Sequence, residues 1–141
     1  MKAEDFKRVL IVDDDAIIRE TLRILLRGEM FSVVGEAGDG IKAMEMMRKH
    51  KPAIVLLDIS MPGASGLEVL QEIREKYPKT MVVMISGEAQ ADTVKAAIEN
   101  GAVGYIVKPF NMANVMQNLK RALQIGIATA KKAQANGAGK V

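Results

Sequence analysis

The stretch VLIVDDDAII, residues 9–18, places four consecutive aliphatic residues directly before three consecutive aspartates. A short continuous apolar run is typical of a strand that is covered on both faces of a parallel sheet. A lone aspartate after such a strand usually caps the following helix, and Asp15, directly before AIIRE, is a candidate for that role. Capping cannot explain both Asp13 and Asp14, because carboxylates held close together repel each other unless a positive group compensates them. We therefore predict that Asp13 and Asp14 bind a cation.

Further apolar runs of strand length alternate along the chain with segments of helical spacing. Ile18, Leu22 and Leu25, for example, stand at i, i+4 and i+7, which is the stripe of an amphipathic helix. Because parallel strands need helical crossovers between them, the alternation predicts an α/β fold with a doubly wound, five-stranded parallel sheet. The predicted strands are RVLIVD (8–13), FSVVGEA (31–37), PAIVLLD (52–58), TMVVMIS (80–86) and VGYIVK (103–108). The other predicted helices are marked by Met44 and Met47, by Leu67, Leu70 and Ile73, by ADTVKAAIENG (91–101), and by Met112, Val115, Met116, Leu119 and Leu123.

The length and composition indicate one globular domain with an aliphatic core. The chain has 141 residues, of which 49% are hydrophobic and 26% charged, and we predict a single domain over residues 1–128. It has no cysteine, which excludes disulfides and thiol catalysis. The one histidine, His50, lies in the charged run RKHK. We interpret it as a solvated residue at a helix end rather than as a metal ligand or a catalytic base.

The net charge of +3 is distributed unevenly, because residues 100–141 carry six lysines and arginines and no acidic side chain. Residues 129–141 are predicted to form a flexible basic tail. Such a tail can attract nucleic acid, but ATAKKAQANGAGKV offers no aromatic residue for stacking on bases, so specific nucleic-acid binding is not expected. The N-terminal MKAEDFKR and the apolar run after it are unlike a signal peptide or a membrane span. We expect a cytoplasmic protein without membrane attachment.

Side chains that could form one site stand at the carboxyl ends of four of the predicted strands. The first strand ends in the run Asp13 to Asp15, the third in Asp58, the fourth in Ser86 and the fifth in Lys108. In doubly wound sheets a ligand binds beyond the carboxyl ends of the strands, where the strand order reverses, so we expect these groups in one pocket. Oxygen ligands with room for water favour Mg²⁺. Structural roles are the alternatives: capping or a turn for Asp58, and a solvated surface position for Lys108.

Two sequences at this edge predict specific loop geometry. Met61-Pro62-Gly63, followed by Gly66, indicates a tightly specified loop after the third strand. After the fifth strand, Lys108 precedes Pro109, and an X-Pro bond in a tight turn is a candidate for the cis form. A cis bond here would aim Lys108 into the pocket.

Four motifs at these strand ends resemble those of the response-regulator receiver domains of two-component signalling, the CheY-like family. IVDDD, LLDISMPGASG, MISGEA and GYIVKPF resemble, in that order, the family's acidic pair, phosphoacceptor loop, hydroxyl position and lysine-proline motif. The match runs from about Arg8 to Leu123, which is nearly the whole chain. The resemblance implies a flavodoxin-like (βα)5 fold with strand order 2-1-3-4-5.

The same resemblance implies a Mg²⁺-dependent phosphoryl transfer. Asp58 would be the nucleophile that accepts a phosphoryl group from the phosphohistidine of a sensor histidine kinase or a histidine phosphotransfer protein. Asp14 would bind Mg²⁺ directly and Asp13 through water, while Asp58 and the main-chain carbonyl of Ser60 would complete the protein ligands. Lys108 would supply a second positive charge, which suits a reaction that depends on positioning and on charge neutralisation.

A conformational switch is also implied by the resemblance. The Ser86 hydroxyl would move to bind the phosphoryl group, and Tyr105 would rotate from solvent into the vacated space. The face formed by helix 4, strand 5 and helix 5 would then change shape for a downstream protein target, in agreement with the weak apolar content of residues 91–101. Alternatively, Tyr105 is only a surface residue of an edge strand. Ser60 and Glu88 match positions that influence attack by water on the phosphoryl group. The resemblance also implies that the chain catalyses its own phosphorylation and dephosphorylation, although it would act mainly as a signalling switch.

The favoured interpretation is a stand-alone response regulator that signals by protein contact or phosphorelay, and three alternatives accompany it. The chain could be the receiver portion of a larger regulator whose output domain is absent, since no helix-turn-helix pattern follows residue 123. A haloacid-dehalogenase-type phosphatase also uses an aspartate nucleophile with Mg²⁺, but it needs an acidic motif after its lysine, and no acid follows Lys108. A flavodoxin-like flavin carrier needs a hydroxyl-rich phosphate loop where this chain has three aspartates.

Overall fold

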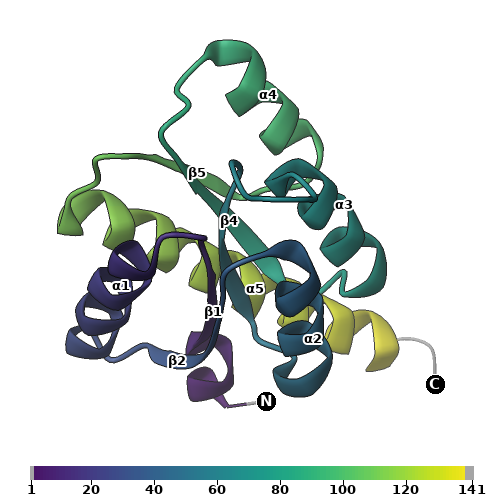
Figure 1. Cartoon of the computed structure of the whole chain (residues 1–141). Coiled ribbons are helices and arrows are strands. Elements are labelled where there is room, and N and C mark those ends of the chain that lie inside the picture. Colours follow the sequence, from purple (N-terminus) through teal and green to yellow (C-terminus); the bar gives the residue numbers. More distant parts are fainter. Residues whose placement is uncertain (1, 139–141) are drawn as a thin grey trace.

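The computed structural model describes residues 2–138, which form a parallel sheet with helices on both faces (Figure 1). All neighbouring strands are parallel, and their order is β2-β1-β3-β4-β5. The α/β class, the doubly wound five-stranded sheet and the strand order 2-1-3-4-5 are therefore confirmed. The strands are β1 (Arg8–Val12), β2 (Ser32–Ala37), β3 (Ile54–Asp58), β4 (Met81–Ser86) and β5 (Gly104–Val107).

Helices cover both faces of the sheet (Figure 1), and the sheet divides the hydrophobic core into two layers, one on each face. α1 and α5 pack on one face, and α2, α3 and α4 pack on the other. Successive strand residues serve opposite layers, as the two-residue period of a strand requires: Val9 and Ile11 belong to the first and Leu10 and Val12 to the second. The bounds are α1 (Ala16–Gly28), α2 (Gly40–His50), α3 (Gly66–Lys76), α4 (Ala91–Glu99) and α5 (Met112–Ala138), preceded by the 3₁₀ turn η1 (Ala3–Lys7).

The central strands hold the frame in place because they are covered on both faces. All residues of β3 and β4 are buried, which explains why their sequences are continuous apolar runs rather than alternating patterns. A fully buried leucine such as Leu56 contributes roughly 1.5–3 kcal/mol through the burial of its side chain. Asp58 and Ser86 therefore stand at the ends of two fully buried strands.

The last helix differs most from the sequence-based expectation. α5 continues to Ala138, ten positions beyond residue 128, where the domain was expected to end. Met112 was expected to face the core, but it is 53% exposed, because it begins the helix at the edge of the molecule. The flexibility of residues 129–141 stays a prediction, and residues 139–141 lie outside the described part. Among the described helices, none has both the length and the apolar composition that a membrane span requires.

Candidate functional site

Three carboxylates meet at the carboxyl edge of the sheet. Asp13, Asp14 and Asp58 each place a carboxylate oxygen within 4.8 Å of the others, and we call this group the acidic site. β1 and β3 are neighbours with Val12 opposite Leu57, so the residues that follow them in sequence leave the sheet at the same level. Asp13 is fully buried and Asp58 is 3% exposed, whereas Asp14 is exposed to solvent. The site therefore has a buried base and an open side.

Lys108 joins the two buried carboxylates from the end of β5. Its Nζ lies 2.7 Å from Asp13 Oδ2 and 3.4 Å from Asp58 Oδ2. The Lys108–Pro109 peptide bond is cis, and the main-chain N–H of Lys108 donates to the carbonyl of Ser86 at 2.8 Å. The sequence-predicted aspartates and lysine are thus brought together in one site.

The charges of the site are only partly balanced. Burial, and then the negative charge of Asp13, raise the pKa of the Asp58 carboxyl above its ordinary value, although Lys108 and the N–H of Ser60 act in the opposite direction. Burial acts to lower the pKa of Lys108, but hydrogen bonding to Asp13 and the charges of both aspartates outweigh it, so that pKa is raised. One ammonium therefore faces more negative charge than it can neutralise.

The raised pKa of Asp58 predicts a pH-dependent stability in the absence of divalent cations. Because the native pKa of Asp58 is raised, the native state binds more protons than the unfolded chain at pH values between the ordinary carboxyl pKa of 3.8 and the native value. The stability contributed by Asp58 is therefore complete below 3.8 and is lost as the pH rises through the native pKa. In EDTA, Asp58→Asn should melt at a higher temperature than the wild type at neutral pH, and the difference should shrink in acid. If thermal melts show the same difference in melting temperature between Asp58→Asn and the wild type at neutral and at acidic pH, this expectation is contradicted.

Asp15 has the structural role expected from its place before α1. Its carboxylate accepts hydrogen bonds from the main-chain N–H groups of Ile17 at 2.9 Å and Ile18 at 3.4 Å, which is the geometry of an N-cap. Its own N–H donates to Asp13 Oδ1 at 2.9 Å. The capping interpretation of Asp15 is confirmed.

The loop after β3 approaches Asp58 so closely that it requires glycine. A Cβ added at Gly66 would lie 2.1 Å from the Asp58 carbonyl oxygen, and the N–H of Gly66 donates to the carbonyl of Ile59 at 2.8 Å. Gly63 has φ +80°, a conformation that favours glycine. The N–H of Ser60 donates to Asp58 Oδ1 at 3.2 Å, so the loop also orients the carboxylate. The tight loop predicted from the sequence is present.

The hydroxyl position and the aromatic position meet at the loop after β4. Ser86 is fully buried, and its Oγ accepts the N–H of Glu88 at 3.1 Å. Tyr105 is half-buried, and its hydroxyl donates to the carbonyl of Glu88 at 2.6 Å. Burial chiefly raises the pKa of Tyr105. Ser86 and Tyr105 thus both hydrogen-bond to the main chain of Glu88, in the loop after β4.

Sequence reasoning did not single out Arg19, which contacts Asp13 of the acidic site, or Glu36, which pairs with Arg19. Arg19 Nη1 donates to the main-chain carbonyl of Asp13 at 2.6 Å, and its Nε lies 3.4 Å from Glu36 on β2. In the sequence, Arg19 looks like a solvated helix residue, since nothing local marks a bond to a carbonyl six positions earlier.

His50, the last residue of α2, is half-buried, and its carbonyl accepts a hydrogen bond from Arg8 at 2.6 Å.

The donor set of the acidic site suits a hard divalent cation. The nearby ligands are carboxylate oxygens, which Mg²⁺ prefers, and exposed Asp14 leaves a side open for water. After burial, the negative charge of Asp13 is a cause of the raised pKa of Asp58, and a cation bound beside both carboxylates would oppose the repulsion between them. The residues therefore fit Mg²⁺.

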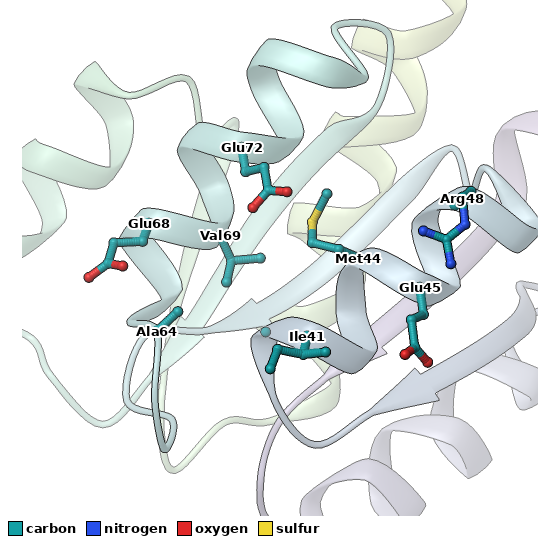
Figure 2. A pocket seen from close by; sticks show the side chains of 9 residues that line it. Ile41, Met44, Glu45, Arg48, Ala64, Glu68, Val69 and Glu72 are labelled. Atoms are coloured by element: carbon teal, nitrogen blue, oxygen red, sulfur yellow. The ribbon is translucent and has the colours of Figure 1, made fainter.

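A separate hollow of about 450 Å³ lies between α2 and α3 (Figure 2). Ile41 and Met44 of α2 and Val69 of α3 are among its lining residues. Two carboxylates at the hollow, Glu45 and Glu72, are ion-paired with lysines of their own helices. None of the aspartates of the acidic site lines this hollow, and its chemistry does not point to a reaction.

Comparison with known proteins gives one consistent family. A family model described as the response regulator receiver domain matches residues 9–120. PdtaR, a transcriptional regulatory protein of Mycobacterium tuberculosis, is 39% identical over 117 residues, which are 83% of this chain and 57% of PdtaR. The chain thus spans little more than half of that relative. The chemotaxis protein CheY of Listeria monocytogenes is 40% identical over 115 residues, with 82% of this chain and 97% of CheY covered.

Solved structures agree with the sequence comparison. A CheY-like receiver domain protein from Methanospirillum hungatei has a TM-score of 0.81 at 26% identity, covering 86% of this chain and 97% of the other. The chain is also similar to a structure from Borrelia burgdorferi described as a CheX-CheY-BeF3-Mg complex. There the TM-score is 0.77 at 35% identity, with 79% of this chain and 85% of the other covered.

Proposed function

This chain belongs to the response-regulator receiver domains of two-component signalling, and we propose that it is a switch that accepts a phosphoryl group on Asp58 in a Mg²⁺-dependent reaction. The observation that carries the proposal is the arrangement of Asp58: a nearly buried carboxylate with Asp13, Asp14 and Lys108 grouped around it. An aspartate that only capped a helix would not need two further carboxylates and an ammonium group beside it.

The proposed reaction moves a phosphoryl group from nitrogen to oxygen. A carboxylate oxygen of Asp58 attacks the phosphorus of a phosphohistidine on a sensor histidine kinase or histidine phosphotransfer protein, the P–N bond breaks, and the imidazole leaves with the bonding electrons. The N–H of Ser60 orients the carboxylate, and the Lys108 ammonium lies 3.4 Å from it, placed to pair with a phosphoryl oxygen. Mg²⁺ held by the acidic site would supply further charge neutralisation for the transferred phosphoryl group.

We assign the metal ligands to the acidic site and its loop. Asp14 would bind Mg²⁺ directly and Asp13 through water, with Asp58 and the main-chain carbonyl of Ser60 as the remaining ligands. Support comes from the grouping of the three carboxylates and from the similarity to a CheY whose structure is described as containing BeF3 and Mg.

The switch would start at the loop after β4 and end on the face of α4, β5 and α5. Ser86 would move to bind the phosphoryl group, which releases the Glu88 N–H and disturbs the loop that Tyr105 contacts. Each of these three elements carries an exposed large apolar side chain: Ile98 on α4, Val107 on β5 and Met112 at the start of α5. We propose that they take part in the contact with a protein target.

The rate at which the phosphoryl group is lost would be set by the residues next to Asp58 and Ser86. Ser60 is small and leaves a path for water, while Glu88 can orient a water molecule or repel it.

We propose a cytoplasmic protein that signals by protein contact or phosphorelay. A second candidate, the receiver portion of a larger regulator, is favoured by the comparison in which the chain spans 57% of PdtaR.

Exposure to acetyl phosphate tests the proposed function without a cognate kinase. With Mg²⁺, intact-protein mass spectrometry should show the addition of one phosphoryl group, because the proposed reaction uses a single acceptor, Asp58. EDTA should abolish the added mass, since Lys108 alone cannot neutralise the incoming charge. The same yield of phosphorylated protein in EDTA would rule out the Mg²⁺-dependent mechanism.

A further inference from the structure

We propose that Arg19 is a positioning residue of the acidic site. Arg19 holds the main chain between Asp13 and Asp14, and its hydrogen bond thereby sets the affinity of the site for Mg²⁺. The inference rests on the proposed function, because it assigns a role toward the same metal. Its basis is a contact that lies outside the ligands themselves: Arg19 Nη1 donates to the carbonyl of Asp13 at 2.6 Å.

The carbonyl of Asp13 is part of the peptide group that leads into Asp14. Fixing its direction therefore also fixes the direction in which the chain presents Asp14. This matters because Asp14 is exposed, and no hydrogen bond to its carboxylate is found within residues 2–138. The metal ligand that is least restrained by its own contacts is thus restrained through the preceding peptide.

The rest of Asp13 is already held by other groups. Its N–H donates to the carbonyl of Ala37 at 3.0 Å. Its carboxylate accepts from the N–H of Asp15 at 2.9 Å and from Lys108 at 2.7 Å. The bond from Arg19 completes this set at a residue that is fully buried. Without it, the carbonyl would have to turn toward another donor, and the peptide would turn with it.

Glu36 holds the guanidinium in place from the neighbouring strand. The carboxylate of Glu36 lies 3.4 Å from Arg19 Nε and 2.5 Å from Arg23 Nη1. A guanidinium can bond two acceptors in fixed directions, so Arg19 can reach Glu36 and the Asp13 carbonyl together.

Arg23 provides a matched control. Both arginines lie on α1, both pair with Glu36, and their side chains are similarly exposed, at 22% for Arg19 and 31% for Arg23. Of these two arginines, only Arg19 has a hydrogen bond to Asp13 among the described contacts. A general loss of packing between α1 and β2 should therefore appear in both variants, whereas a positioning effect should appear in one.

The test is calorimetric titration of Mg²⁺ into EDTA-treated and desalted wild type, Arg19→Met, Arg23→Met and Arg19→Lys. Loss of a residue that orients a metal ligand weakens metal binding by about 10–100-fold, and we expect about tenfold for Arg19→Met. Arg23→Met should stay close to the wild type. Arg19→Lys should recover part of the affinity, because an ammonium can still donate to the carbonyl but lacks the fork that reaches Glu36 as well.

Unchanged or tighter Mg²⁺ binding by Arg19→Met would overturn the proposal, and so would equal weakening in Arg23→Met. If Arg19→Met does not fold in thermal melts, Glu36→Gln decides: weaker Mg²⁺ binding supports the proposal, and unchanged binding overturns it. Failure of the proposed function would look different, since the wild type would then bind no Mg²⁺ or Asp14→Asn would bind it as the wild type does.

Discussion

Asp58→Asn is expected to lose phosphoryl labelling by acetyl phosphate almost completely, by about a thousandfold or more in rate. The amide of asparagine cannot attack phosphorus as a carboxylate does, so the substitution removes the nucleophile on which the reaction depends. The substitution preserves shape, and the raised pKa of Asp58 indicates that the folded protein tolerates a neutral group there. Labelling is measured as the rate of mass increase in the intact protein.

Asp15→Asn is the matched control for this result. Asp15 lies in the same run of aspartates, but its carboxylate caps α1, and asparagine caps a helix about as well as aspartate. The control variant should therefore be labelled at nearly the wild-type rate. Wild-type labelling of Asp58→Asn would show that another group accepts the phosphoryl group.

Asp14→Asn should weaken Mg²⁺ binding by about a hundredfold or more. Asp14 is the exposed carboxylate of the acidic site, and the loss of a charged ligand should cost at least as much as the loss of an outer-shell partner. The stability of the metal-free protein should be unchanged or raised, because one source of carboxylate repulsion is gone. Lower metal affinity without lower stability is the signature of a ligand rather than of a packing residue.

Titration calorimetry and thermal unfolding measure these two quantities separately. A cation that binds only the native state stabilises it by about 2.7 kcal/mol at a hundredfold excess over its dissociation constant, so the wild type should melt higher with Mg²⁺. Asp14→Asn should lose most of this increase, and Asp15→Asn should keep it. Unchanged affinity in Asp14→Asn would place the metal elsewhere.

The sheet could be predicted from the sequence because its strands are buried on both faces. The continuous runs at 54–58 and 81–86 have few alternative structures, and helical segments between them leave parallel pairing as the simplest topology. The same topology explains why the site was accessible to sequence reasoning. Asp13 and Asp58 directly follow or end neighbouring parallel strands, so their proximity needs no knowledge of distant side chains.

Features that depend on side-chain contacts or on chain length beyond the core were not predictable in the same way. The Arg19–Glu36 pair joins residues whose neighbours in sequence give no sign of it. α5 continues beyond its apolar stripe because alanine, lysine and glutamine favour a helix even without a core to cover. The contact of the Tyr105 hydroxyl with the carbonyl of Glu88 depends on a side-chain rotamer that sequence patterns do not specify.

The most direct test of the central claim is to locate the phosphoryl group on the chain. Protein labelled with acetyl phosphate and Mg²⁺ can be reduced with borohydride, which converts an acyl phosphate into a stable alcohol, and then digested for peptide mass spectrometry. The account predicts that the modification lies at Asp58 and that Asp13, Asp14 and Asp15 are unmodified. Modification of any of those three aspartates instead of Asp58, or no modification, would contradict it.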